Sequence, residues 1–267
     1  MNISPTSCPI CTSQRFELIG TYSKPDQYEL RAGFNDEAYY RDWVRCSECS
    51  LAYSRYSRDT SLLDNLYINN YRSNSRQIFE KVIRLLPSES ETKQRVNWIL
   101  TNLEVLKHKP VNCLDIGGGS GVYAYEMTSL GYSCSIIDPF EYNHHLDTEY
   151  GLTVFREFLT SSTCLSFKYD LISMNFVLEH LPDPLQLLRT AKSHLAPQGY
   201  LYIEVPNDLS FDCRALDDDV FNSCHLTLFN LSTIKNLLDR LSLRIVAYQE
   251  FETPRRYMSL RLLCTLP

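Results

Sequence analysis

The sequence predicts an α/β protein in which a doubly wound parallel sheet follows a small N-terminal module. Three features predict it: short apolar segments alternate with helical patterns after Pro110, a glycine-rich turn at 117–121 joins the first of these segments to a helix, and two Cys-x-x-Cys pairs lie near the N-terminus. With 267 residues, 44% of them hydrophobic, the chain is long enough for one larger and one smaller domain.

Composition divides the chain into three regions. Residues 1–60 are rich in Tyr, Ser and Arg, contain both cysteine pairs and have too few aliphatic residues to fold unaided, so we expect a separate small module there. Residues 61–108 form a helical linker, because apolar residues recur at helical spacing on both sides of the Pro87-Ser88 break. The larger domain then occupies 109–267.

Strands and helices alternate along the larger domain. Strands are predicted at VNCLDI, SCSIID, 152–155, YDLISM, YLYIEV, LRIVAY and MSLRLLCTL, and helices at 121–130, 184–195 and 232–241. Repeated strand-helix-strand units of this kind form parallel sheets. Only a short turn separates the last two strands, so we expect these two to pair antiparallel.

Charge and targeting patterns exclude several classes of partner. The 26 basic and 32 acidic residues leave a net charge of −6, which disfavours nucleic acid as a partner, although the basic residues between Arg41 and Arg58 are a local exception. The sequence lacks a basic, apolar N-terminal start and any run of about 18 apolar residues, so we expect a cytoplasmic protein with no membrane association.

The glycine-rich turn has the features of a ligand-binding corner. Gly117, Gly119 and Gly121 allow positive φ angles and close approach of a ligand to the backbone. Asp115 ends the strand before the turn, and Asp138 ends the next strand, 21 residues beyond Gly117. An acid at that second strand end accepts hydrogen bonds from the ribose of an adenosine cofactor.

Three cofactors compete for this corner. A phosphate-binding loop needs a Lys after Gly121, which is absent. A nicotinamide site needs Gly-x-Gly-x-x-Gly/Ala, which Gly119, Gly121 and Ala124 match, so the glycines alone leave this alternative open. Asp115 argues against it, because a carboxylate there faces a pyrophosphate unfavourably but holds the ammonium of an amino acid moiety.

Residues 115–121 match the Asp-x-Gly-x-Gly-x-Gly motif of class I methyltransferases, and the chain resembles that family across about 111–245. The further matching blocks are YDLISMNFVLEHLPDP, LAPQGYLYIEVPN and HLTLFNLSTIKNLLDRLSL. The resemblance implies a Rossmann-like methyltransferase core that uses S-adenosylmethionine. It also implies that Asp115 and the three glycines contact the methionine part of this cofactor, Asp138 its ribose, and Asn175 its sulfonium end.

The two Cys-x-x-Cys pairs, separated by 34 residues, predict a tetrahedral four-thiolate zinc site in the module. Its ligands are Cys8, Cys11, Cys46 and Cys49. Such a site has no open position for a substrate, so the metal is structural and contributes folding free energy. Redox dithiols are the alternative. Because Thr12 and Ser50 follow the pairs where Gly is common, we expect less regular turns.

Four cysteines before such a core also resemble the N-terminal and middle parts of bacterial sugar C-methyltransferases. Those enzymes carry a further C-terminal domain, whereas this sequence ends at Pro267, just after the last predicted strand. The resemblance implies a small-molecule or sugar-type acceptor and O- or C-methylation.

Two histidines are candidates for the proton acceptor, because an imidazole titrates near neutral pH. His225, in the loop after YLYIEV, is preferred to His180, and both are predicted at the carboxyl edge of the sheet, where such folds bind ligands. The alternatives are a backbone-bonded His180 and a packed His225. Four tyrosines either line an acceptor pocket or pack: Tyr39, Tyr40, Tyr67 and Tyr71.

Three functions remain open at this point. The first is an enzyme that methylates a small molecule or sugar. The second is an RNA or protein methyltransferase that docks through the zinc module, and the third is a non-catalytic scaffold that binds the cofactor.

Overall fold

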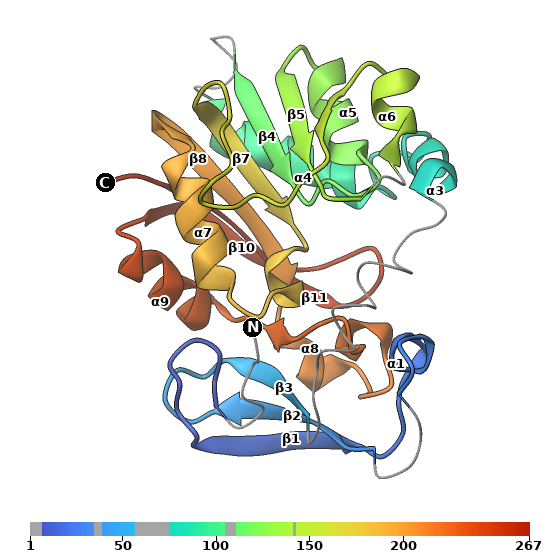
Figure 1. Ribbon diagram of the computed structural model, residues 1–267, viewed down its shortest axis with the longest axis vertical. Coiled ribbons are helices and arrows are strands. Elements are labelled where there is room, and N and C mark those ends of the chain that lie inside the picture. The colour runs from blue at the N-terminus through green and yellow to red at the C-terminus, as the bar shows by residue number, and fades with distance from the viewer. Residues whose placement is uncertain (1–6, 35–38, 57–74, 105–110, 141–142) are drawn as a thin grey trace.

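The protein was analysed as a computed structural model that describes residues 7–34, 39–56, 75–104, 111–140 and 143–267. Two sheets organise it (Figure 1): a seven-stranded sheet ordered β10-β11-β8-β7-β4-β5-β6, and a four-stranded sheet ordered β1-β2-β3-β9. Neighbours among β4 to β8 pair in parallel, while β11 pairs antiparallel with β8 and β10. The predicted α/β class and the antiparallel final strands are therefore confirmed.

The predicted strands and helices of the larger sheet are all present. The strands are β4 (Asn112–Ile116), β5 (Ser133–Ile137), β6 (Thr153–Phe155), β7 (Tyr169–Asn175), β8 (Leu195–Pro206), β10 (Arg244–Glu252) and β11 (Met258–Thr265). The helices are α3 (Ser75–Val82), α4 (Glu91–Asn102), α5 (Val122–Ser129), α6 (His145–Thr148), α7 (Pro184–Ser193), α8 (Ser210–Cys213) and α9 (Leu231–Arg240). Within the described residues, no helix has the length and apolar character needed to cross a membrane.

Helices cover both faces of the larger sheet, which makes it doubly wound. On one face, α7 and α9 pack through residues such as Leu188 and Leu237. On the other face, α3, α4 and α5 pack through Phe79, Ile99 and Met127. Because both faces are covered, the open edge at the carboxyl ends of β4, β5 and β7 is where a ligand can reach the sheet.

Local sequence signals set the starts of these helices. The Asp183 side chain accepts from the Gln186 N–H at 3.0 Å and begins α7, with Pro184 in the first turn. The Asn230 side chain likewise accepts from the Thr233 N–H at 2.9 Å and begins α9. These caps satisfy backbone donors that a helix start leaves unpaired.

The N-terminal segment forms an antiparallel sheet that the sequence did not predict. Its strands are β1 (Phe16–Tyr22), β2 (Arg41–Cys46) and β3 (Ala52–Tyr56), with a short helix α1 (Gln27–Arg31) after β1. The fourth strand, β9 (Thr227–Leu228), comes from the region after β8 and pairs with Ala52 and Tyr53 of β3. Figure 1 shows this sheet beside the carboxyl edge of the larger sheet, with α8 between them.

The loop between β8 and β9 packs on this small sheet. Trp43, fully buried in β2, stacks edge-on against Phe211 and Phe221 and donates from Nε1 to the Phe221 carbonyl at 3.4 Å. The Asp26 carboxylate accepts from the N–H and the hydroxyl of Ser223 at 2.6 and 2.8 Å. The N-terminal segment thus fixes the loop that carries His225.

Candidate active site

The glycine-rich turn between β4 and α5 has the backbone that its sequence predicts. Gly117, Gly119 and Gly121 have φ angles of 66°, 53° and 79°, in the left-handed region that favours glycine. A Cβ on Gly121 would lie 2.4 Å from Leu146 Cδ1, and a Cβ on Gly117 would lie 2.9 Å from Val177 Cγ2. A side chain at either position would therefore displace Val177 or Leu146 and would strain the left-handed backbone.

Substitution of Gly121 should show how much of the need for glycine at this position comes from contact with Leu146 and how much from the backbone conformation. Gly131 is a matched control, because it also has a positive φ, of 90°, but no atom lies within 4 Å of the position that a Cβ would take there. We expect Gly131→Ala to lower the free energy of unfolding by about 1–2 kcal/mol through backbone strain alone. Gly121→Ala should cost about 1–3 kcal/mol more, because Leu146 must move.

Chemical denaturation of the two variants and the parent chain measures this difference. Equal losses of stability in the two variants would show that contact with Leu146 does not constrain the turn.

Asp115 lies at the end of β4, is 1% exposed, and faces the end of β7. Its Oδ1 accepts hydrogen bonds from the Ser173 hydroxyl and the Asn175 side-chain amide, both at 2.8 Å. Its Oδ2 and the Asn175 Oδ1 are buried without a hydrogen-bond partner among the described residues. A ligand that brings several N–H donors, such as an ammonium, would satisfy these buried acceptors.

Asp138 lies at the end of β5 beside the same turn and is 3% exposed. Its Oδ2 accepts from the Gly119 N–H at 2.9 Å, and its Oδ1 accepts from the Phe140 N–H at 3.1 Å. Both predicted strand-end carboxylates therefore flank the glycine turn. This arrangement, a glycine-rich bend whose one side chain is that of Ser120, flanked by two acids, fits the methionine and ribose parts of S-adenosylmethionine.

Burial raises the pKa of Asp115 to about 7, against the opposing hydrogen bonds from Ser173 and Asn175. A cationic ligand group favours the ionised carboxylate, so binding releases a proton below that pH and affinity rises as pH increases through 7. We expect S-adenosylmethionine affinity to fall up to about 15-fold between pH 7 and pH 5.5. Calorimetry across this pH range measures the effect. The control is Asp115→Asn, whose remaining affinity for S-adenosylmethionine should not change with pH.

The four module cysteines converge. The Sγ atoms of Cys8 and Cys49 lie 3.5 Å apart, as do those of Cys11 and Cys46, and all four sulfurs lie within 4.8 Å of one another. The hydrogen bond between Cys8 and Cys49 lowers the pKa of Cys8 to about 5 and raises the pKa of Cys49, so the first thiol of this pair ionises more readily than the second. Four sulfurs from two turns fit a tetrahedral zinc ion.

The two cysteine turns are alike, contrary to the expected irregularity. Thr12 and Ser50 follow the second cysteine of each pair with φ angles of 61° and 62°. Their N–H groups donate to the carbonyls of Cys8 and Cys46 at 2.9 and 3.0 Å. Both turns thus adopt the left-handed backbone that glycine usually supplies.

The two candidate histidines lie side by side, with ring centroids 5.0 Å apart. His180 ends a short 3-10 helix, η3 (Leu178–His180), and its Nδ1 lies 2.7 Å from the Cys224 carbonyl. His225 is held in the same way, with Nδ1 2.7 Å from the Val220 carbonyl, and its burial lowers its pKa. Because a carbonyl only accepts, Nδ1 is the protonated nitrogen of each ring and Nε2 carries the lone pair of the neutral imidazole.

Glu179 completes this group and was not singled out from the sequence. It is fully buried, and its Oε1 lies 4.0 Å from His180 Nε2. The sequence feature that could have identified Glu179 is its position next to His180, just after the end of a predicted strand. The sequence did not show that His225 would join them.

A family comparison accounts for the larger part of the chain. The family model described as "Methyltransferase domain" matches residues 70–248. The chain belongs to this family.

Relatives of the methyltransferase domain include a ubiquinone biosynthesis O-methyltransferase of Haemophilus ducreyi, 32% identical over 124 residues. That match covers 42% of this chain and 52% of the relative, so the chain spans about half the length of the curated relatives it matches.

Two solved structures show the same fold. A 1,6-didemethyltoxoflavin-N1-methyltransferase of Burkholderia thailandensis has a TM-score of 0.57 at 16% identity, covering 86% of this chain and 96% of that chain. An S-adenosylmethionine-dependent methyltransferase of Clostridium acetobutylicum has a TM-score of 0.54 at 13% identity, covering 72% of this chain and 97% of that chain.

Other candidate residues of the N-terminal segment have structural partners. The Tyr39 hydroxyl donates to the buried Glu29 carboxylate at 2.7 Å, and the Tyr40 hydroxyl donates to Asp42. Tyr67 and Tyr71 lie outside the described residues. These contacts support packing for the first two tyrosines.

Two arginines of the basic stretch in the same segment pair with acids. Arg41 is fully buried against Asp26 and Glu29, and Arg45 pairs with Asp208 while 34% of its side chain remains exposed. Arg41 therefore presents no basic surface.

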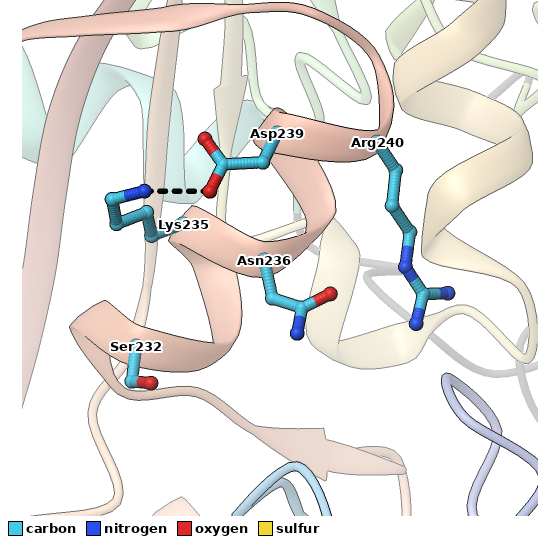
Figure 2. Close-up of a pocket in the computed structure, with 5 residues that line it drawn as sticks. All are labelled: Ser232, Lys235, Asn236, Asp239 and Arg240. Carbon is cyan, nitrogen blue, oxygen red and sulfur yellow. Dashed lines mark hydrogen bonds and ion pairs between the residues drawn. The ribbon is translucent and has the colours of Figure 1, made fainter.

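A shallow surface pocket lies on α9, away from the glycine turn. Figure 2 shows its five lining residues on one helix, with an ion pair between Lys235 and Asp239. All belong to a polar helix surface: Ser232, Lys235, Asn236, Asp239 and Arg240. This pocket has none of the features of the donor site.

Proposed function

We propose that the protein transfers the methyl group of S-adenosylmethionine to the hydroxyl oxygen of a small molecule. The observation that carries this proposal is the pair of buried acceptors, Asp115 Oδ2 and Asn175 Oδ1, beside a turn with three left-handed glycines. Such a pair requires a donor-rich cationic group, which the methionine ammonium supplies. The second acid, Asp138, lies on the other side of that turn and would hold the ribose.

The chain's own residues would then position the reactants and remove a proton. When bound, the cofactor supplies an electrophilic methyl group on a sulfonium, whose departure needs no acid. The acceptor hydroxyl must lose its proton as its oxygen attacks in line. His225 and His180 provide the proton acceptor through Nε2, and the lowered pKa keeps His225 neutral near pH 7.

The relatives favour a small hydroxylated acceptor. Their printed names describe O-methyl transfer in ubiquinone biosynthesis, and their similarity covers about half of each relative. A sugar-type acceptor, methylated on oxygen or on carbon, is the alternative acceptor, and the transfer assays described below include it. The burial of Arg41 and the pairing of Arg45 with Asp208 leave fewer free cations on the N-terminal segment, which argues against a nucleic acid docked there.

The zinc site would have a structural role in this function. Four thiolates saturate a tetrahedral ion, so the ion has no position left for a substrate. Its contribution would be the stability of the small sheet on which the His225 loop packs.

Isothermal titration with S-adenosylmethionine, followed by methyl transfer assays against phenols, sugar nucleotides and RNA, tests the proposal. We expect micromolar binding and transfer to a phenol or another small hydroxyl compound. Transfer to RNA alone would replace this function by the macromolecular one. Binding without transfer to any acceptor would favour the scaffold, and no binding would refute both enzymatic functions.

Replacement of His225 should separate its role from that of an ordinary partly buried histidine. We expect His225→Gln to lower kcat about 10²–10⁴-fold with little change in cofactor affinity, because a general base is lost. His194→Gln is the matched control, since His194 is a partly buried histidine at the end of α7, outside the site. Equal kcat values for the two variants would exclude His225 as the base.

A further inference from the structure

A second group of side chains with the chemistry of a metal site lies at the carboxyl edge of the larger sheet. Glu179 and His180 come from η3 after β7, and His225 comes from the loop before β9. One donor atom of each lies within 4.8 Å of the others. We propose that these three residues bind one divalent transition-metal cation, which holds the acceptor oxygen during methyl transfer.

The two imidazoles have the orientation of metal ligands. Each directs Nδ1 to a backbone carbonyl at 2.7 Å, that of Cys224 for His180 and that of Val220 for His225. A histidine ligand characteristically donates its other ring N–H to a carbonyl or carboxylate, which fixes the ring and the tautomer. Because this second contact is present for both rings, Nε2 of each is the nitrogen that would coordinate the ion.

The carboxylate supplies the charge that such an ion requires. Glu179 is fully buried, and its Oε1 lies 4.0 Å from His180 Nε2. A carboxylate beside two neutral imidazoles offers a divalent cation one negative charge together with two nitrogen donors. Small shifts of these side chains bring three ligand atoms to the roughly 2 Å coordination distance of such ions.

The ligand set also distinguishes this site from the cysteine site. Two imidazoles and one carboxylate on one face suit Fe²⁺, Mn²⁺, Co²⁺ or Zn²⁺ and leave coordination positions open. Four thiolates form a closed site. The site formed by Glu179, His180 and His225 can therefore accept a substrate oxygen, whereas the four-cysteine site cannot.

The chemical role of the ion rests on the proposed O-methyl transfer, but its binding does not. A coordinated hydroxyl has a lowered pKa and loses its proton to solvent water. The new O–CH₃ bond forms as the S–CH₃ bond breaks, and the sulfur becomes a neutral thioether. The oxidation state of the metal does not change. With the cation bound, His180 and His225 act as ligands and the coordinated hydroxyl loses its proton to water, whereas direct proton transfer to an imidazole describes the metal-free chain.

Titration of the full zinc-loaded chain with Mn²⁺, followed by electron paramagnetic resonance, tests the site. Mn²⁺ is suitable because it binds thiolates weakly and would not displace zinc from the cysteines. We expect about one bound Mn²⁺ per chain, with electron-nuclear coupling to two imidazole nitrogens. Glu179→Gln and His225→Ala should each weaken binding at least about tenfold, whereas His194→Ala should bind as the parent does.

The outcomes separate this inference from the proposed function. An unmodified chain that binds no Mn²⁺, or binds it without nitrogen coupling, overturns the inference whether or not the variants fold. Retained affinity in Glu179→Gln and His225→Ala overturns it as well. S-adenosylmethionine titration of the same samples reports the donor site independently, so coupled Mn²⁺ without donor binding would support the metal site and refute the methyltransferase function.

Discussion

Asp115→Ala is expected to abolish detectable binding of S-adenosylmethionine. The variant removes the buried carboxylate that would pair with the ammonium, and it leaves the Ser173 hydroxyl and the Asn175 amide without their acceptor. Loss of one partner of a buried charged pair costs about 2–5 kcal/mol, which corresponds to about 30-fold to several-thousand-fold in affinity. Calorimetric titration at pH 8, where Asp115 is ionised, measures the full effect.

Two further variants make this experiment specific. Asp115→Asn keeps the size of the side chain but removes its charge, and we expect it to lose most of the same affinity. Asp170→Ala removes an acid from the opposite end of β7, where its Oδ2 accepts from the Asn112 N–H at 3.0 Å. We expect this control to bind as the parent does. Wild-type affinity in Asp115→Ala would contradict the assignment of the donor site.

The double variant Cys8→Ser with Cys46→Ser is expected to lose bound zinc and to unfold the N-terminal sheet. One ligand is removed from each turn, so the remaining two thiols, Cys11 and Cys49, cannot hold a tetrahedral ion. Structural zinc contributes about 10–16 kcal/mol of apparent binding free energy to small modules, more than such a sheet can replace. Elemental analysis should give about one zinc per parent chain and none in the variant.

Limited proteolysis reports the structural part of this prediction, because β2 and β3 should become sensitive to cleavage. The control is Cys113→Ser with Cys264→Ser, which replaces two buried cysteines of the larger sheet. We expect the control to retain its zinc and its protected N-terminal sheet. A parent chain without zinc, or a cysteine-pair variant that keeps it, would disprove the site.

The larger sheet was predictable because its signals are local. Each strand is a short apolar run, and the glycine turn and Asp115 lie within seven residues of one another. The meeting of Asp115 with Asn175 follows from the pairing of β4 with β7, since parallel neighbours end at the same edge. The convergence of the four cysteines was predictable from their spacing, whereas the regularity of their two turns was not.

The N-terminal sheet was not predictable, because its buried residues mix charged with apolar side chains. β2 is buried along most of its length, yet it contains Arg41 and Asp42. Arg41 is stabilised by Asp26 and Glu29 from the segment around α1. An ion pair of this kind leaves no hydrophobic periodicity in the sequence.

The grouping of His225 with Glu179 depends on a long-range contact. The loop before β9 has no periodic pattern, and its position is fixed by Trp43 and Asp26 of the N-terminal segment. The sequence predicted both histidines at the same sheet edge but contained no signal that their rings would lie close together. The role of Glu179 follows only from that proximity.

The shared strand β9 bears on how such proteins can be recombined. A chimaera joined near residue 60 would separate β3 from Leu228 and Trp43 from Phe221, leaving two apolar surfaces without partners. A workable graft must carry the first 56 residues together with the segment from Asn207 to Phe229. The cysteine-bearing segment and the loop that contributes His225 would then be inherited as one unit, so that changes in one of them constrain changes in the other.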